Sequence, residues 1–230
     1  YATILAQFMA MCWQFYLFSD KKEFLHLKRS TLKLKSELVE GIISIGISPF
    51  SMNACSCLVV IFINNALVRN GGDYAVGAYA IGNRIVFMFF MITLGIIQGM
   101  QPIAGYNFGA KKYDRLMRVV RYAIVCTTTV LTVGWLACEL LTSFCVQLFT
   151  SDSELAGIAR HGLRVNAALL PVIGFGMVAT NFFQSIGKAK ISIFLSLSRQ
   201  MLLLIPMISV FSSLYGVDGV WFSLPASDLL

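Results

Sequence analysis

The sequence predicts an all-α protein, a polytopic transmembrane helical bundle with about six to seven spans. Of its 230 residues, 57% are hydrophobic and 13% are charged, and the mean hydropathy is +0.76. Soluble domains carry about 25% charged residues. The apolar residues are gathered into long runs separated by short polar stretches, and the interior runs exceed the ~20 residues that a helix needs to cross a ~30 Å hydrocarbon core.

The apolar runs locate the expected spans along the chain. They cover approximately residues 1–18, 38–68, 76–108, 116–149, 163–187, 191–214 and 217 to the end. The chain starts inside the first run without a methionine and stops inside the last, so we expect it to be a piece of a longer protein.

Basic residues indicate the orientation of these spans. Thirteen of the eighteen Lys and Arg residues lie in three short stretches, 19–37, 109–121 and 188–190, which are separated by pairs of spans. By the positive-inside rule these stretches are cytoplasmic loops of an inner-membrane protein. The net charge of +7 then reflects topology and contact with the lipid bilayer, not a nucleic-acid partner. Leucines alternate with the charges of the first stretch, so it is also a candidate amphipathic surface helix.

Polar and thioether side chains recur on single helical faces of several spans. In the 76–108 run, steps of three and four residues align Arg84, Met88, Met91, Gly95, Gln98 and Pro102. Similar stripes are Gly46, Pro49, Asn53, Cys57 and Asn64; Asn166, Gly174, Met177, Asn181 and Gln184; and Ser192, Arg199, Pro206 and Ser213. Because an ionisable or amide group is costly in lipid, these faces should turn toward protein or water.

The stripes have two interpretations. They can surround one hydrated substrate pathway, for which the candidates are Asn53, Asn64, Arg84, Met88, Met91, Gln98, Gln101, Met177, Asn181, Gln184 and Arg199. They can also be packing contacts between helices, with Gly95-x-x-x-Gly99 and Gly105-x-x-x-Gly109 as sites of close approach. The prolines inside the spans, Pro49, Pro102, Pro171 and Pro206, predict kinks of the kind that border transporter cavities.

Residue types that would indicate an enzyme are missing from the spans. The six cysteines all lie in apolar runs, where a thiol behaves as a small hydrophobe, and His26 and His161 have no neighbouring ligands in the sequence. HExxH and GxSxG motifs and a buried pair of aspartates, as an intramembrane hydrolase would need, do not occur. We therefore predict a non-enzymatic protein without a metal site or cofactor.

Five motifs resemble the C-terminal lobe of the multidrug and toxic compound extrusion (MATE) family. They are GISPFSMNA (46–54), IQGMQPIAGYNFGAKKYDR (97–115), FFQSIGKAK (182–190), SRQ (198–200) and GVDGVWFSLPASD (216–228). The resemblance implies that residues 1–18 end the last helix of the N-lobe, 19–37 form a cytoplasmic interlobe linker, and 38–230 form helices seven to twelve. It also implies a full-length monomer that exchanges H+ or Na+ for small cationic or amphiphilic compounds.

One departure from the family pattern concerns the coupling acid. One branch of the family has a glutamate shortly after the proline of helix seven, whereas Pro49 is followed here by Phe50, Ser51, Met52, Asn53, Ala54 and Cys55. The resemblance therefore implies that the main acid lies in the N-lobe, outside this chain, with Asp228 as a weaker candidate for cation coupling. Two alternatives remain open at this point, a lipid-linked oligosaccharide flippase of the same wider superfamily and a structural membrane subunit.

Overall fold

A computed structural model describes residues 2–19 and 35–229, and throughout these ranges the regular elements are helices, without a strand. The elements are α1 (Ala2–Ser19), α2 (Ser36–Gly109), α3 (Tyr113–Leu140), α4 (Thr142–Gln147), α5 (Ser153–Ala167), α6 (Leu170–Ser185), α7 (Ala189–Leu197), the π-helix η2 (Ser198–Leu204) and α8 (Ile205–Leu229). The all-α prediction is confirmed. The chain divides into two units, residues 1–44 and 45–230.

The first unit contains α1 and the start of α2. Every side chain of α1 from Thr3 to Ser19 is exposed, including the aromatic rings of Trp13 and Tyr16. The predicted linker over 19–37 and His26 fall mostly on residues 20–34, outside the described residues. The amphipathic helix expected there stays a prediction.

The second unit consists of long apolar helices that identify a multi-pass membrane protein. Three helical segments are long and apolar enough to cross a membrane, Phe50–Gly109, Tyr113–Leu140 and Lys190–Leu229, and a fourth is α5 with α6, bent by 52° at their junction. The first segment has 60 residues, which as one straight helix would measure about 90 Å, about three times the hydrocarbon core.

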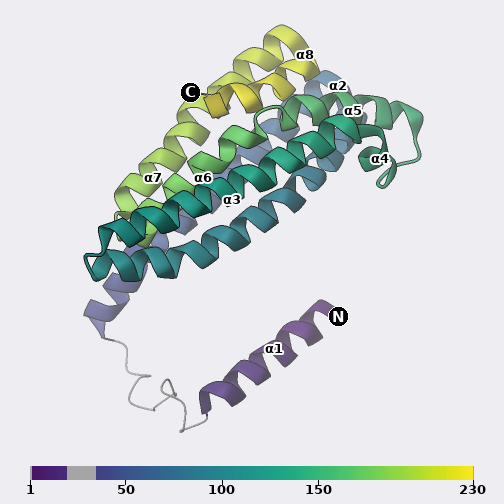
Figure 1. The fold of residues 1–230 in the computed structure, drawn as a ribbon. Coiled ribbons are helices and arrows are strands. Elements are labelled where there is room, and N and C mark those ends of the chain that lie inside the picture. The colour runs from purple at the N-terminus through teal and green to yellow at the C-terminus, as the bar shows by residue number, and fades with distance from the viewer. Residues whose placement is uncertain (1, 20–34, 230) are drawn as a thin grey trace. The chain divides into compact units, whose positions relative to one another are not determined.

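Two glycines divide the longest segments. Gly72 and Gly216 interrupt α2 and α8 with positive φ values of 62° and 63°, a conformation that glycine adopts without a steric penalty. Each therefore turns one long helical segment into two arms, and Figure 1 shows α8 folding back on itself. The second arm of α8 extends only to Leu229.

Two polar stretches between the apolar runs are mostly helical, so the loop predicted over 109–121 is wrong for most of its length. The stretch around residue 155 is the helix α5, because the Asp152 carboxylate caps it by accepting from the Glu154 and Leu155 amides at 2.9 and 3.2 Å. The basic stretch 109–121 lies mostly in helix α3, which begins at Tyr113. Its arginines are helical residues near a helix start, and only the turn around Lys111 and Lys112 is a loop.

The buried side chains form two separate clusters along the bundle, in which α3 and α6 lie side by side (Figure 1). The first cluster includes Leu67, Leu163 and Trp221 and lies toward the glycine end, which we define by the turns at Gly72 and Gly216. The second includes Ile97, Leu116 and Val178 and lies toward the lysine end, defined by the turns at Lys112 and Lys188. The bend between α5 and α6 and the π-helix η2 fall between the two ends.

Gly162 is required for the close packing of α5 against α8. A Cβ at this position would overlap the indole ring of Trp221, which is 1% exposed and cannot move aside. We expect Gly162→Ala to lower the free energy of unfolding by about 1–3 kcal/mol, as overpacking does in a dense core. Thermal unfolding of the full-length protein in detergent micelles measures this effect.

Gly157 in the same helix provides the matched control. A Cβ there meets no atom within 4 Å, so Gly157→Ala should leave the unfolding temperature unchanged or raise it, since alanine is favoured over glycine in a helix by about 0.5–1 kcal/mol. Equal unfolding temperatures for the two variants would contradict the packing of Gly162 on Trp221.

Candidate functional site

The second arm of α2 presents an exposed stripe of polar and thioether side chains. Its members are Arg84, Met88, Met91, Gly95, Gln98 and Pro102, and all six are exposed. The side chains of Met88 and Met91 are 62% and 47% exposed. The opposite side of the same arm is buried, with Val86, Thr93, Ile97, Met100 and Ala104. We call the six exposed residues the α2 stripe.

The glycines of the α2 stripe region do not act as packing sites within the described residues. A Cβ at Gly95 or Gly99 would meet nothing within 4 Å, so the first of the two small-residue motifs is open. In contrast, a Cβ at Gly105 would lie 3.1 Å from the Ser185 carbonyl oxygen of α6. Only the Gly105 motif therefore brings two helices close together here.

Pro102 adds a backbone acceptor to the α2 stripe. Proline has no amide N–H, so the carbonyl of Gln98, one turn earlier, receives no helical hydrogen bond from it. The helix continues through Pro102 without a non-helical residue. The Gln98 side-chain amide and backbone carbonyl therefore place two polar groups at one position of the stripe.

Gln101 and Asn181 are brought together from different helices. The Gln101 Nε2 donates to the Asn181 Oδ1 at 3.0 Å, and the Asn181 Nδ2 donates to the Met177 carbonyl oxygen at 2.9 Å. Both side chains are partly buried between α2 and α6. This contact joins two candidate pathway residues, and Gln184 is partly buried one turn further along α6.

Gly174 and Met177, which belong to the same stripe as Asn181, are packed against protein. A Cβ at Gly174 would lie 3.2 Å from Leu131 Cδ1 and 3.3 Å from the Thr128 amide nitrogen of α3. Met177 packs against the second buried cluster. These two residues of α6 therefore fit the interpretation in which the stripes are packing contacts between helices. On the first arm of α2, Asn53 is exposed and Asn64 is partly buried.

Arg199 and Asp228 form an ion pair between η2 and α8. The Arg199 Nη1 donates to the Asp228 Oδ1, and the two side chains are 45% and 13% exposed. The single face expected from seven-residue spacing is not kept, because Ser192 is buried whereas Arg199 is exposed. That spacing assumes a regular α-helix, and a π-helix has a different hydrogen-bond register.

A contact between η2 and α2 was not predicted from the sequence. The Gln200 Nε2 donates to the Ser56 Oγ at 3.3 Å, and Ser56 donates to the Met52 carbonyl oxygen at 3.0 Å. The Gln200 Oε1 is buried and has no hydrogen-bond partner. The only signal for this residue was its place in the SRQ motif (198–200).

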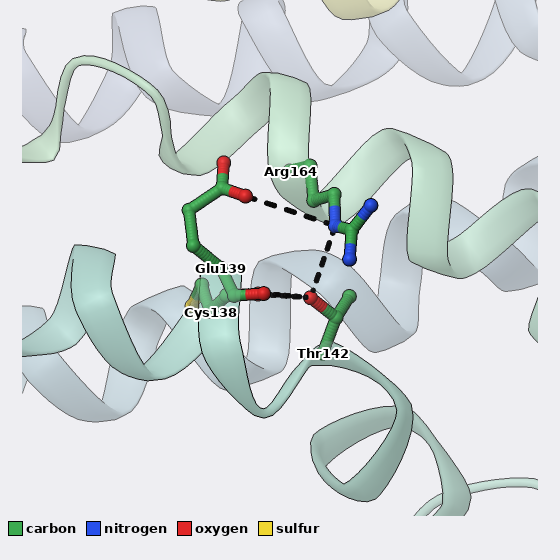
Figure 2. A network of polar contacts seen from close by, with 4 residues as sticks. All are labelled: Cys138, Glu139, Thr142 and Arg164. Carbon is green, nitrogen blue, oxygen red and sulfur yellow. Dashed lines mark hydrogen bonds and ion pairs between the residues drawn. The ribbon is translucent and has the colours of Figure 1, made fainter.

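The glycine end carries ion pairs that fix α5 (Figure 2). The Arg164 Nε lies 3.7 Å from the Glu139 Oε2 and donates to the Thr142 Oγ1 at 3.2 Å. Thr142 in turn donates to the carbonyl oxygens of Cys138 and Glu139. These bonds tie α5 to the junction of α3 and α4, where the chain changes direction.

His161 and Cys145 are two further titratable groups near this end. His161 Nε2 lies 3.2 Å from Asp218 Oδ1, with both side chains more than half exposed. Burial raises the pKa of the Cys145 thiol on α4, which keeps it protonated and a poor nucleophile at neutral pH. Among residues 2–19 and 35–229, no group of three His, Cys, Asp or Glu residues is placed to hold a metal ion.

The chain is similar to known proteins of one family. The MatE family model matches residues 47–210. The multidrug export protein MepA of Staphylococcus haemolyticus (strain JCSC1435) is 28% identical over 207 residues, which is 90% of this chain and 45% of that protein. MepA of Staphylococcus aureus (strain N315) is 28% identical over 198 residues, 86% of this chain and 43% of that protein. The chain thus spans a little under half the length of these relatives.

Solved structures of similar fold also extend beyond this chain. A MATE protein in complex with MaL6 superimposes with a TM-score of 0.91 at 20% identity, covering 100% of this chain and 52% of that one. The outward-facing conformation of a multidrug resistance MATE family transporter of the MOP superfamily gives 0.83 at 20% identity, covering 94% and 49%. The shared fold is therefore that of about one half of each solved chain.

Proposed function

Because this chain belongs to the MatE family, we propose that it forms one lobe of a multidrug efflux transporter, which exports cationic or amphiphilic compounds in exchange for H+ or Na+. The match to MepA proteins, whose name describes multidrug export, supports this proposal. So does the coverage of about half of each solved MATE chain. Residues 38–230 are then the C-lobe, 19–37 the linker, and 1–18 the end of the N-lobe.

The α2 stripe is the observation that carries the proposal. An exposed guanidinium, an amide and a backbone carbonyl that lacks its α-helical donor are costly to hold against acyl chains on a spanning helix. They are compatible with a water-filled cleft, which the missing lobe would complete. Met88 and Met91 line the same stripe, and unbranched thioethers adapt to ligands of different shape, which suits a transporter with many substrates.

The charges at the lysine end support the proposed orientation. Lys111, Lys112 and Lys188 lie at the turns of this end, and Arg115 lies in the first turns of α3. At the glycine end, His161 and Arg164 of α5 are matched by Asp218 and Glu139. By the positive-inside rule the lysine end faces the cytoplasm, so substrates would leave toward the glycine end.

Transport by the full-length protein tests this function. In a bacterial host lacking its own efflux pumps, cells expressing the protein should extrude a cationic dye. We expect the dye gradient that the cells sustain to fall at least about tenfold when the coupling gradient is collapsed, by a protonophore for H+ or by removal of sodium for Na+, because a tenfold ion gradient is worth about 1.4 kcal/mol. Continuous dye fluorescence with the collapsed gradient as internal control measures the effect.

Three outcomes separate the candidate functions. Dye extrusion that survives loss of both gradients would contradict antiport. A protein that moves no dye but transfers a lipid-linked sugar between leaflets would be a flippase. A protein that does neither, at normal expression, would point to a structural subunit.

A further inference from the structure

The interior of the second unit contains few charged groups. Between Ile45 and Val68, and throughout α6, the sequence has no Asp, Glu, Lys or Arg. From Ile191 to Val217 the only one is Arg199, and from Gly219 to Leu230 the only one is Asp228. The structure joins these two residues to each other. They are therefore a balanced pair of charges set apart from those at the ends of the helices.

Distances counted along the helices place both members of the pair near the middle of a bundle of membrane thickness. Arg199 is ten residues from Ala189, where α7 begins, which is about 15 Å along the helix. Asp228 is twelve residues from the turn at Gly216, or about 18 Å along the second arm of α8. The two distances are measured from opposite ends of a ~30 Å hydrocarbon core. Both residues therefore lie at about half the depth of that core.

The two partners differ in their access to solvent. The Asp228 side chain is 13% exposed and the Arg199 side chain is 45% exposed. A carboxylate enclosed in this way needs a compensating positive charge, because an unpaired buried ion is strongly destabilising. The guanidinium can leave for water on its long, flexible side chain at much lower cost. Asp228 is thus the fixed partner and Arg199 the movable one.

The backbone that carries Arg199 is irregular. Arg199 and Gln200 lie in the π-helix η2, which ends just before Pro206. Proline cannot donate to the carbonyl of Leu202, so the α-helical bond at this point is lost, and single π-helical turns are frequent at functional sites. The neighbouring Gln200 has a buried side-chain oxygen without a partner. Arg199 is therefore attached to a segment whose hydrogen bonds are incomplete.

We propose that Asp228 is a proton-binding site of this lobe, neutralised by Arg199 in the arrangement seen here and by a proton in another state of the transport cycle. This inference rests on the proposed antiport function and deepens it. Proton binding breaks the ion pair, neutralises the enclosed carboxylate and releases the Arg199 charge into the hydrated cleft. A proton is favoured over Na+ because a hard metal cation takes several oxygen ligands, and among the described residues no group of three His, Cys, Asp or Glu side chains is placed to hold a metal ion.

Most other charged groups on the packed elements lie elsewhere. On α8 itself, Asp218 pairs with His161 at the glycine end. On α5, Arg164 pairs with Glu139, and Arg160 donates to the Ala156 carbonyl oxygen. α7 contributes Lys190 near the lysine end, and α6 contributes no ionisable side chain. On α2, Arg84 is twelve residues from the turn at Gly72 and therefore also lies at mid-depth, but its guanidinium stays protonated. Titration at mid-depth is therefore assigned to Asp228.

The test uses the full-length protein in proteoliposomes, with dye movement and internal pH recorded together. Asp228→Asn should retain downhill dye exchange within about twofold and lose proton-driven uphill transport at least tenfold. Arg199→Gln should retain uphill transport, with its half-maximal pH moved upward by about one unit, because the guanidinium favours the ionised carboxylate. Asp218→Asn, an exposed acid on the same helix, is the control and should keep wild-type coupling.

The outcomes distinguish the proposal from a structural ion pair and from failure of the proposed function. If Asp228→Asn still pumps dye against a proton gradient, or if Arg199→Gln leaves the pH profile in place, the proton site is disproved. The same holds if each single variant is impaired and Arg199→Gln combined with Asp228→Asn restores uphill transport, since that pattern marks a purely structural pair. Uphill transport driven by Na+ alone would assign the coupling to another ion. A wild-type protein that moves no dye would overturn the proposed function itself.

Discussion

Asn181→Leu is expected to destabilise the full-length protein by about 1–3 kcal/mol and to reduce dye efflux at least severalfold. The substitution removes the acceptor for the Gln101 Nε2 and leaves a polar group partly buried between α2 and α6 without its partner. In a membrane interior such a group has little water to replace the lost bond. Thermal unfolding in micelles and efflux rates at matched expression measure the two effects.

A double-mutant cycle isolates the Gln101–Asn181 contact. Gln101→Met alone should be nearly as destabilising, because Asn181 then lacks its donor, while the double variant should recover at least about 1 kcal/mol as the two apolar side chains pack together. Efflux should remain low in the double variant if the two amides contact substrates. If the two single effects simply add, the amides do not interact in the full-length protein.

A cysteine placed at Gln98 should make efflux sensitive to a membrane-impermeant, charged thiol reagent. In a background in which the six natural cysteines are replaced, Gln98→Cys should react rapidly and lose at least about 90% of its transport after labelling, a change in activation barrier of about 1.4 kcal/mol. The reason is that the α2 stripe faces water in the proposed cleft. Mass spectrometry of labelling and dye efflux are read on the same sample.

Val125 provides the control for this experiment. Its side chain is 56% exposed on α3, and it belongs to none of the polar stripes, so we expect it to face lipid. Val125→Cys should therefore resist the charged reagent, since thiolate formation and reagent access both require water. Equal labelling of the two positions, or labelling of Gln98→Cys without loss of transport, would contradict the placement of the α2 stripe along the pathway.

The apolar runs were sufficient to predict the fold class because in lipid the helix is the main way to satisfy backbone groups within one segment. The sequence did not predict α5. This stretch is rich in charged and small residues, a composition that is typical of a loop. The helix forms because Asp152 caps it and because Ala156, Ala159 and Leu163 bury one face against the first cluster. That burial depends on tertiary neighbours such as Trp221, which a local pattern does not contain.

The candidate site was predictable where it depends on helical spacing alone. The α2 stripe follows from steps of three and four residues, and its members do share an exposed side. The stripe of η2 and α8 was less predictable, because a π-helix changes the register on which spacing arguments rely. Contacts between distant segments, such as Gln200 with Ser56, 144 residues apart, have no periodic signal in a single sequence.

The turns at Gly72 and Gly216 also determine where foreign sequence can be inserted. Because each reversal is made by a single residue with positive φ inside a helical segment, neither leaves a loop at the glycine end in which a protease site or an epitope could be displayed. Within the described part of that end, the stretch after α4, residues 148–152, is the longest one outside a helix. An antibody tag or a cleavage site meant to report on this face of the membrane therefore belongs between Phe149 and Asp152.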